Sequence, residues 1–122
     1  DKKVDYKRYD SLFSTALVYE KKEILIPMAV GRLLYPYQLA KEAEKSYEAY
    51  VRKNLEKCAR FYLEKSNWHE VYDYFDRGNF WSREALESII EAASRKKAVD
   101  IVGYLMEEKR KKFAGKEKKF EL

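Results

Sequence analysis

Few residues of this chain have the types and spacing that catalysis or metal binding requires. His69 is the only histidine, and it lies beside Glu70 and one helical turn before Asp73, a spacing that could orient an imidazole ring. One histidine without a cysteine pair does not supply the ligands of a zinc or iron site. We therefore expect no metal, and we favour a surface contact of His69 over a role as ligand or general base.

Cys58 is the only cysteine, so the chain cannot form an intramolecular disulfide, and we expect a cytoplasmic location. It lies within a long apolar stripe, where a free thiol usually behaves as a small buried hydrophobic group. A nucleophilic cysteine needs a positioned base, and nothing in the sequence places His69 beside it. The four glycines are scattered and form no phosphate-binding loop. We expect no cofactor.

The carboxylates occur in groups that also hold lysine or arginine. A hydrolase dyad needs two carboxylates held apart from neutralising cations, and the sequence gives no such isolation. We interpret the groups as solubilising helix charges: Glu42 and Glu44; Asp73 and Asp76; Glu84, Glu87 and Glu91. The sequence therefore predicts that the chain is not an enzyme and has no catalytic residues.

The net charge of +5 is concentrated in the C-terminal part of the chain. From Arg95 to Leu122 there are ten Lys or Arg and five Asp or Glu, whereas residues 1–94 hold sixteen of each sign. Such a cationic end complements the negative end of a helix dipole. The alternative is weak, sequence-independent binding of a nucleic-acid backbone, with a steep salt dependence. The residues that would carry it are Lys109, Arg110, Lys111 and Lys112.

Two groups of aromatic residues lie outside the apolar stripes. Tyr35 and Tyr37 flank a proline, and Phe80 and Trp81 lie in a predicted loop. Loops held by rigid helices concentrate binding residues, and Trp and Tyr are frequent interface anchors. We therefore expect these four residues to bind a partner. The alternative for Phe80 or Trp81 is a hydrophobic staple that folds back onto the following helix.

The elements that must position these residues are predicted to be helices. Of the 122 residues, 39% are charged and 16% aromatic, with four Gly and two Pro, a composition that disfavours a β-sandwich or a disordered chain. We expect one domain over residues 1–122, with flexible ends at 1–9 and 114–122. The longest uncharged runs, residues 24–31 and 33–40, are too short to span a bilayer, so we expect no membrane partner.

Three stretches share one plan, in which an apolar segment, a polar elbow and a second apolar segment follow each other. Such a plan predicts stacked helix pairs. The stretches run from Leu12 to Leu34 with an elbow at residues 20–22, from Cys58 to Phe75 with an elbow at Ser66 and Asn67, and from Leu86 to Met106 with an elbow at Lys96 and Lys97.

Local signals set the expected helix boundaries in the first half of the chain. Asp10 or Ser11 can cap a helix that ends at Tyr19. A second helix follows the elbow, and Pro27 requires that it either starts late or is kinked. The Tyr35–Tyr37 segment ends this helix, because the residue before a proline disfavours helical backbone angles.

Further boundaries follow in the second half. No Gly or Pro interrupts residues 40–65, so we expect one long helix there. Asn67, with a glutamate three positions later, forms a capping-box pattern. Gly78 is the expected left-handed C-cap of that helix, and Ser82 is the expected N-cap of the next.

The segment from Ala85 to Glu107 resembles the helix pair of an ankyrin repeat, because an alanine-bearing first helix is followed by a loop and a second helix of the pattern acidic-Ile-Val-x-x-Leu-Leu. The match to the second helix lies at residues 100–102 and 104–107, and residues 71–79 resemble the end of an upstream repeat with its turn at residues 78–79. The elbows at Ser66 and Lys96 lie about one ankyrin period, roughly 33 residues, apart.

The resemblance departs from the family at the start of the repeat. Glu84-Ala85-Leu86-Glu87 stands where the family has Thr-Pro-Leu-His, and Ala85 follows Gly78 by seven positions, which leaves little room for a β-hairpin finger. The resemblance covers about the last 50 residues. It implies partner binding through an elongated surface, with no catalytic residues to transfer.

Together these patterns predict an all-α fold of about six helices in stacked antiparallel pairs, an ankyrin-like α-solenoid without clear β-hairpin fingers. We expect a non-catalytic protein–protein interaction or structural module. Since the sequence begins at Asp1 without Met, we expect it to belong to a larger protein. Similar ankyrin-like helical segments occur in bacterial proteins, so the resemblance implies a bacterial origin. A protein partner is expected, nucleic acid is the alternative partner, and a symmetric homodimer stays open.

Overall fold

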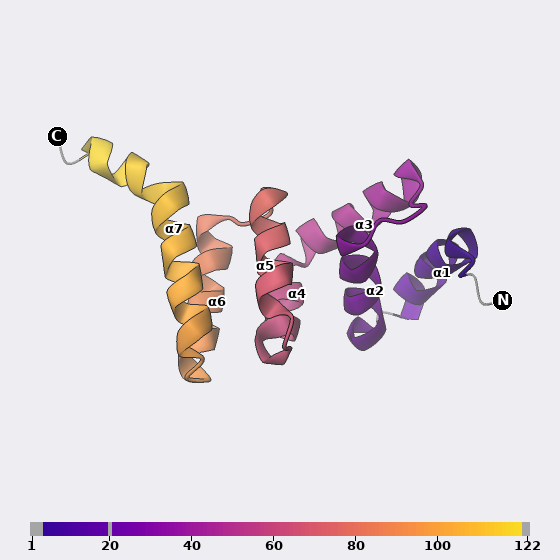
Figure 1. Ribbon diagram of the computed structural model, residues 1–122, viewed down its shortest axis with the longest axis horizontal. Coiled ribbons are helices and arrows are strands. Elements are labelled where there is room, and N and C mark those ends of the chain that lie inside the picture. The colour runs from indigo at the N-terminus through magenta and orange to yellow at the C-terminus, as the bar shows by residue number, and fades with distance from the viewer. Residues whose placement is uncertain (1–3, 20, 121–122) are drawn as a thin grey trace. The chain divides into compact units, whose positions relative to one another are not determined.

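The computed structural model describes residues 4–19 and 21–120, with side chains described as far as Phe113. Over these residues the chain is helical and contains no strand, which confirms the predicted all-α class. Seven α-helices and one 3-10 helix are described (Figure 1): α1 (Tyr6–Tyr19), α2 (Lys22–Leu34), α3 (Lys41–Lys53), α4 (Leu55–Phe61), η1 (Tyr62–Glu64), α5 (Trp68–Arg77), α6 (Arg83–Arg95) and α7 (Val99–Phe120).

The chain divides into two compact units, Asp1–Asn54 and Leu55–Leu122. The boundary falls inside the segment for which we predicted one long helix, and that prediction is wrong. Asn54 leaves the helical conformation, with φ −120° and ψ 34°, and its side-chain Nδ2 donates to the carbonyl oxygen of Tyr50 at 2.9 Å. Asparagine competes for backbone hydrogen bonds in this way, and so it ends α3.

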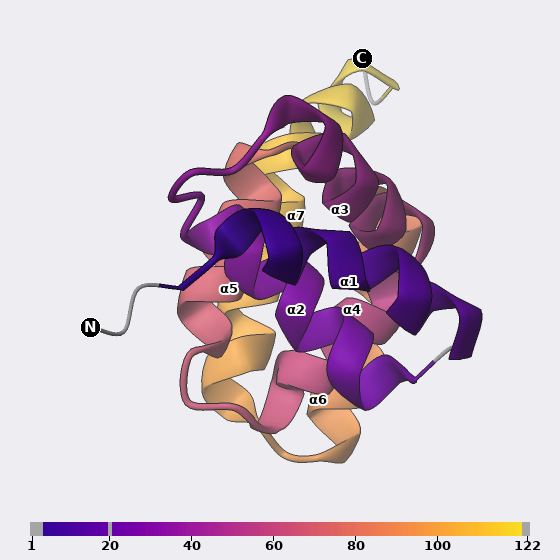
Figure 2. The ribbon, with the colours of Figure 1, turned by 90° about the vertical axis from the view of Figure 1, so that its right-hand side faces the viewer.

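Helix α1 starts earlier than predicted, at Tyr6. The carboxylate of Asp5 accepts a hydrogen bond from the backbone amide of Arg8 at 3.1 Å, which is the geometry of an N-cap, so capping at Asp10 or Ser11 is wrong. Phe13 is the apolar side chain of α1 that lies in the core, at 2% exposure. Figure 2 faces this unit and shows α1 in front of α2 and α3.

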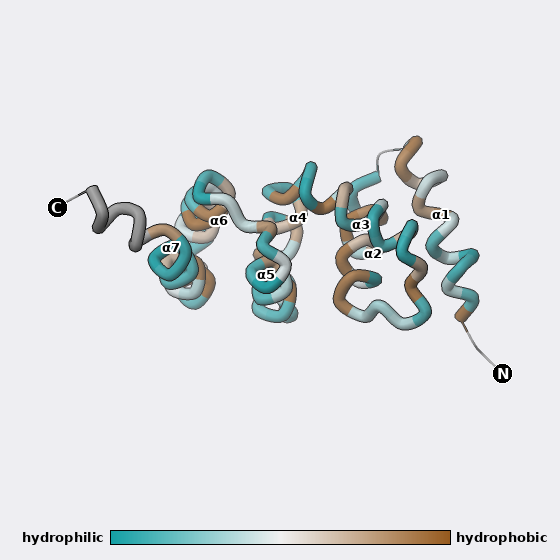
Figure 3. The backbone as a smooth tube through the Cα atoms, turned by 90° about the horizontal axis from the view of Figure 1, so that it is seen from above, coloured by the Kyte–Doolittle hydropathy of each residue, from teal (hydrophilic) through white to brown (hydrophobic). Residues whose placement is uncertain are grey.

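Helix α2 begins at Lys22, five residues before Pro27, so the late start that the proline allowed does not occur. Among the three helices of the first unit, α2 is the most apolar, as its brown colour in Figure 3 shows. The core of the first unit lies along it, with Ala29 and Val30 fully buried. It ends at Leu34, directly before the Tyr35–Tyr37 segment, as predicted.

In the second unit, α5 begins after Asn67 as predicted, but the Asn67 side chain makes no capping hydrogen bond. The prediction that a left-handed Gly78 caps the C-terminus of α5 is also wrong in one detail. Gly78 has φ −84°, and the left-handed residue is Asn79, with φ 57°. Gly78 is needed for space instead, because a Cβ there would lie 2.5 Å from Cε1 of Phe80.

Helices α6 and α7 form a pair joined by a tight turn in which Lys97 has φ 58°. Ser82 caps α6 as predicted, since its hydroxyl accepts a hydrogen bond from the amide of Ala85 at 3.1 Å. The two helices bury Leu86, Ile89 and Leu105. The backbone of α7 is helical to Phe120. The flexibility expected for the two ends of the chain stays a prediction, and residues 1–3 and 121–122 of these ends lie outside the described residues.

Candidate functional site

A buried arginine organises the first unit. The Nε of Arg32 donates to Oδ1 of Asp10 at 2.9 Å, and its Nη2 donates to Oδ2 at 3.2 Å, so the pair is bidentate. Both side chains are only 6% exposed. The hydrogen bonds and the charge of Asp10 raise the pKa of Arg32, although burial opposes this. A buried charge pair of this geometry joins α1 to α2.

The same carboxylate also joins α1 to α3. The hydroxyl of Tyr47 donates to Oδ1 of Asp10 at 2.5 Å. Burial and the hydrogen bond to Asp10 raise the pKa of Tyr47, so the phenol stays protonated as a donor. The ring of Tyr47 packs edge-on against Phe13, with centroids 4.7 Å apart. One aspartate therefore fixes three helices.

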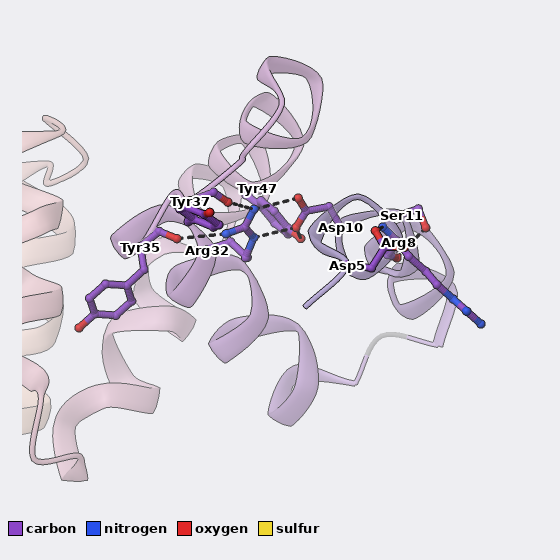
Figure 4. Close-up of polar contacts among 8 residues, drawn as sticks. All are labelled: Asp5, Arg8, Asp10, Ser11, Arg32, Tyr35, Tyr37 and Tyr47. Carbon is purple, nitrogen blue, oxygen red and sulfur yellow. Dashed lines mark hydrogen bonds and ion pairs between the residues drawn. The ribbon is translucent and has the colours of Figure 1, made fainter. Parts of the chain in front are cut away.

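Arg32 also holds the turn that follows α2. Its Nη1 donates to the carbonyl oxygen of Tyr35 at 3.1 Å, and its Nη2 donates to that of Tyr37 at 2.8 Å. The guanidinium lies 4.2 Å from the ring centroid of Tyr6. Figure 4 shows these bonds, with the ring of Tyr35 pointing away from the buried cluster. The backbone of the turn is therefore fixed from inside the unit.

The side chains of this turn are exposed. Tyr35 is 59% exposed and Tyr37 is 64% exposed. The Tyr37 ring rests edge-on against Tyr6, with centroids 5.6 Å apart. The structure thus places both predicted aromatic residues at the surface of the first unit. It also shows that their backbone is anchored, which the sequence did not indicate.

A groove of about 470 Å³ lies beside this cluster in the first unit. Phe13, Tyr47 and Asp10 contribute to its lining, and the rest comes mainly from small side chains of α1 and α3: Ser11, Ser14, Ala43 and Ser46. Gln38 and Ala40 continue the lining from the turn. The volume is within the range of pockets that accept a small molecule or a partner side chain.

The other predicted aromatic pair is not at the surface. Phe80 is 8% exposed and Trp81 is 4% exposed, so neither ring is an exposed anchor in this structure, and their binding of a partner stays a prediction. Trp81 donates from Nε1 to the carbonyl oxygen of Tyr72 at 3.3 Å, and both rings pack against Phe75. The aromatic contacts of the two rings are with the preceding helix α5. A staple onto the following helix α6, which has no aromatic residue, stays a prediction.

The basic run of α7 is paired with carboxylates. Lys109 lies 3.0 Å from Glu87, and Arg110 donates to Glu107 at 3.1 Å. Lys111 and Lys112 lie 3.9 Å and 3.0 Å from the carboxylates of Glu108 and Asp76. Asp76 is therefore more than the solubilising charge that the sequence suggested, because it pairs with a lysine of another helix. Glu108 is only 7% exposed.

The two residues with the most familiar chemistry occupy different surroundings. Cys58 is fully buried, and burial raises the pKa of its thiol to about 12, which opposes formation of the nucleophilic thiolate. His69 is exposed, and its ring contacts Trp68 and Tyr104. Among the described residues, no group of three or more His, Cys, Asp or Glu side chains could hold a metal ion.

Comparison with known proteins finds no matching family model, no curated protein that matches and no solved structure that matches. The resemblance to ankyrin repeats stays a prediction. No described helix is long and apolar enough to cross a membrane.

Proposed function

We propose that this chain is a non-catalytic protein–protein interaction module and that it binds its partner through the tyrosine turn, residues Tyr35–Tyr37. One observation carries the proposal. The turn exposes two tyrosine rings while the buried Arg32 holds its backbone through two carbonyl oxygens. A backbone fixed in this way loses little conformational freedom on binding, which increases affinity.

The chemistry of the turn suits a protein partner. Tyrosine offers a large apolar ring and a hydroxyl, and it is enriched at the centres of protein interfaces. The lining of the groove combines the aromatic rings of Phe13 and Tyr47 with three serines and with charged side chains that include Lys7 and Glu42. A side chain of the partner could enter this groove while the backbone around it contacts Tyr35 and Tyr37.

The surroundings of the reactive groups support a role without catalysis. The thiol of Cys58 is buried and protonated, and Asp10 is fully engaged with Arg32 and Tyr47. A nucleophile needs an accessible position and an activating base. These arrangements favour binding over chemistry.

The direct test is capture of a partner from cell extract at high salt, compared between the wild type and the double variant Tyr35→Ala/Tyr37→Ala. Both bonds from Arg32 go to backbone atoms, so the variant should keep the turn in place while it removes the rings. The matched control is Tyr19→Ala, because Tyr19 is another exposed tyrosine of this unit, at 67% exposure.

We expect one protein to be retained by the wild type and the control and to be lost from the double variant. Equal retention by the double variant would show that the tyrosine turn is not the binding surface. Because hydrophobic anchors are insensitive to screening, retention should survive high salt.

The alternative, nucleic-acid binding by the C-terminal basic run, has less support because each of its four cations lies near a carboxylate. Backbone binding by lysine and arginine should weaken steeply with salt. Reversal of the charges of Lys109, Arg110, Lys111 and Lys112 tests it. Loss of oligonucleotide retention at low salt would favour this alternative, and unchanged retention would exclude it.

A further inference from the structure

The second unit contains a pocket of about 360 Å³ that is lined by residues of α4, η1 and α6. This volume lies in the range of pockets that accept a small molecule. The lining combines two apolar side chains, three cations, one carboxylate and one hydroxyl: Leu63 and Ala92; Arg60, Arg95 and Lys96; Glu91; and Ser88. All of these residues belong to the second unit, so the pocket is separate from the tyrosine turn.

The helical repeat of α6 and one contact with α4 bring these side chains together. Ser88, Ala92 and Arg95 are spaced by four and three positions, which places them on one face of α6. Arg60 reaches this face from α4, because its Nη2 donates to Oγ of Ser88 at 2.8 Å. Lys96 follows directly as the C-cap residue of α6. Cations from two helices therefore contribute to one concave site.

The charges of the lining favour an anion. Its three cations exceed its single carboxylate by two positive charges, and a concave site with charges of one sign attracts ions of the opposite sign. Arginine presents a planar fork of N–H donors that matches phosphoryl oxygens. In the described contacts, Arg60 and Arg95 both use Nη2. The N–H groups on Nε and Nη1 of each guanidinium are left for a ligand.

The ion pairs that these cations make are weak competitors for an anion. Each cation has one carboxylate partner: Glu56 for Arg60, Glu91 for Arg95 and Glu64 for Lys96. About half or more of every side chain in these pairs is exposed. Exposed pairs contribute little, so the cations can turn to a bound anion at small cost. Lys112 of the α7 basic run differs, because its pair with Asp76 is less exposed, at 22% and 30%.

We propose that this pocket binds a small phosphate monoester. The phosphoryl group contacts Arg60, Arg95 and Lys96, and the uncharged body of the ester lies beside Leu63 and Ala92. The second pKa of such an ester is about 6, so that it is mainly a dianion at neutral pH. Its two negative charges match the excess of the lining. This site is independent of the proposed binding of a protein by the tyrosine turn.

The test is a titration of the full 122-residue chain, labelled with 15N, with phenyl phosphate at pH 7.5 and constant ionic strength. We expect saturable shifts that are largest at the amides of residues 60, 88, 92, 95 and 96. Inorganic phosphate lacks the apolar body, so it should shift the same amides with lower affinity. Phenyl sulfate has the same ring but one negative charge, and it should also bind more weakly.

Two variants remove one cation each. Arg60→Gln and Arg95→Gln keep most of the side-chain stem and lose the charged donors, so each should weaken binding of phenyl phosphate by about tenfold or more. The described contact of Arg95 lies within its own helix, so its variant leaves the packing of α4 on α6 intact. Arg77→Gln is the matched control, because Arg77 forms an exposed ion pair in the same unit and is outside the lining. It should keep the wild-type affinity.

A third variant tests the place of the ester's body. Ala92→Leu fills part of the pocket without a change of charge, so it should weaken binding of phenyl phosphate more than that of inorganic phosphate. A wild type that phenyl phosphate does not saturate would overturn the proposal. Equal affinity in Arg95→Gln and Arg77→Gln, or phenyl sulfate that binds as tightly as phenyl phosphate, would overturn it as well.

Discussion

The bidentate pair of Arg32 and Asp10 is the interaction on which the first unit depends most. Both partners are almost completely buried, and removal of one leaves the other as an uncompensated charge. Breaking such a pair typically costs about 3–5 kcal/mol. We therefore expect Asp10→Asn, which keeps the side-chain shape, to lower the free energy of unfolding by that amount in urea titrations. Asp73→Asn breaks an exposed pair with Arg77 and should cost less than about 1 kcal/mol. Similar losses in the two variants would contradict the assigned role.

Two glycines of the second unit should respond to alanine with opposite signs. At Gly78 a Cβ would lie 2.5 Å and 2.8 Å from two atoms of the Phe80 ring, which is itself packed against Phe75. We expect Gly78→Ala to destabilise by about 1–3 kcal/mol, as overpacking does. At Gly103, inside α7, nothing lies within 4 Å of such a Cβ. Gly103→Ala should stabilise by about 0.5–1 kcal/mol. Thermal unfolding of both variants checks the signs, and equal signs would be inconsistent with this packing.

At the scale of the helix, the two predicted N-caps differ. Ser82 accepts a hydrogen bond from the amide of Ala85, whereas Asn67 makes no side-chain cap bond. We expect Ser82→Ala to cost about 1 kcal/mol and Asn67→Ala clearly less. Denaturant midpoints of the two variants give the comparison. A larger loss at Asn67 would mean that the capping box forms in solution after all.

Helix boundaries that depend on local chemistry could be predicted from the sequence. Ser82, the Lys96–Lys97 elbow and the Tyr35–Tyr37 stop were all predicted, because each acts on its own backbone. The break at Asn54 was not, because an asparagine within an apolar stripe signals a break only when its side chain turns back to the backbone.

The buried cluster could not be predicted in the same way. Arg32 and Asp10 are 22 positions apart, and nothing local marks which of the 26 Lys and Arg residues is buried. Tyr35 and Tyr37 are exposed, as their expected role requires, whereas the sequence left exposure and packing open for Phe80 and Trp81. A Trp in a loop gives the same sequence pattern whether its ring is exposed or buried. The packing of the Trp81 ring against α5 decides that it is buried.

At the scale of the whole molecule, the chain forms two compact units, and one thiol can report on the opening of the second. Cys58, the only cysteine, is fully buried in the second unit. Because burial raises the pKa of its thiol to about 12, a thiol reagent should modify native protein only through opening of that unit. We expect slow labelling in native buffer that accelerates with urea. Native labelling at the rate of an unfolded thiol would show that Cys58 is accessible.

The central claim is that an internally anchored tyrosine turn binds a protein. Photo-crosslinking tests it most directly, with a photoreactive phenylalanine analogue placed at position 35 or, as a control, at position 19. Both replace exposed tyrosines of the first unit. We predict one discrete protein adduct in cells from position 35 and none from position 19. Absence of an adduct at position 35, or the same adduct from both positions, would contradict the proposed binding surface.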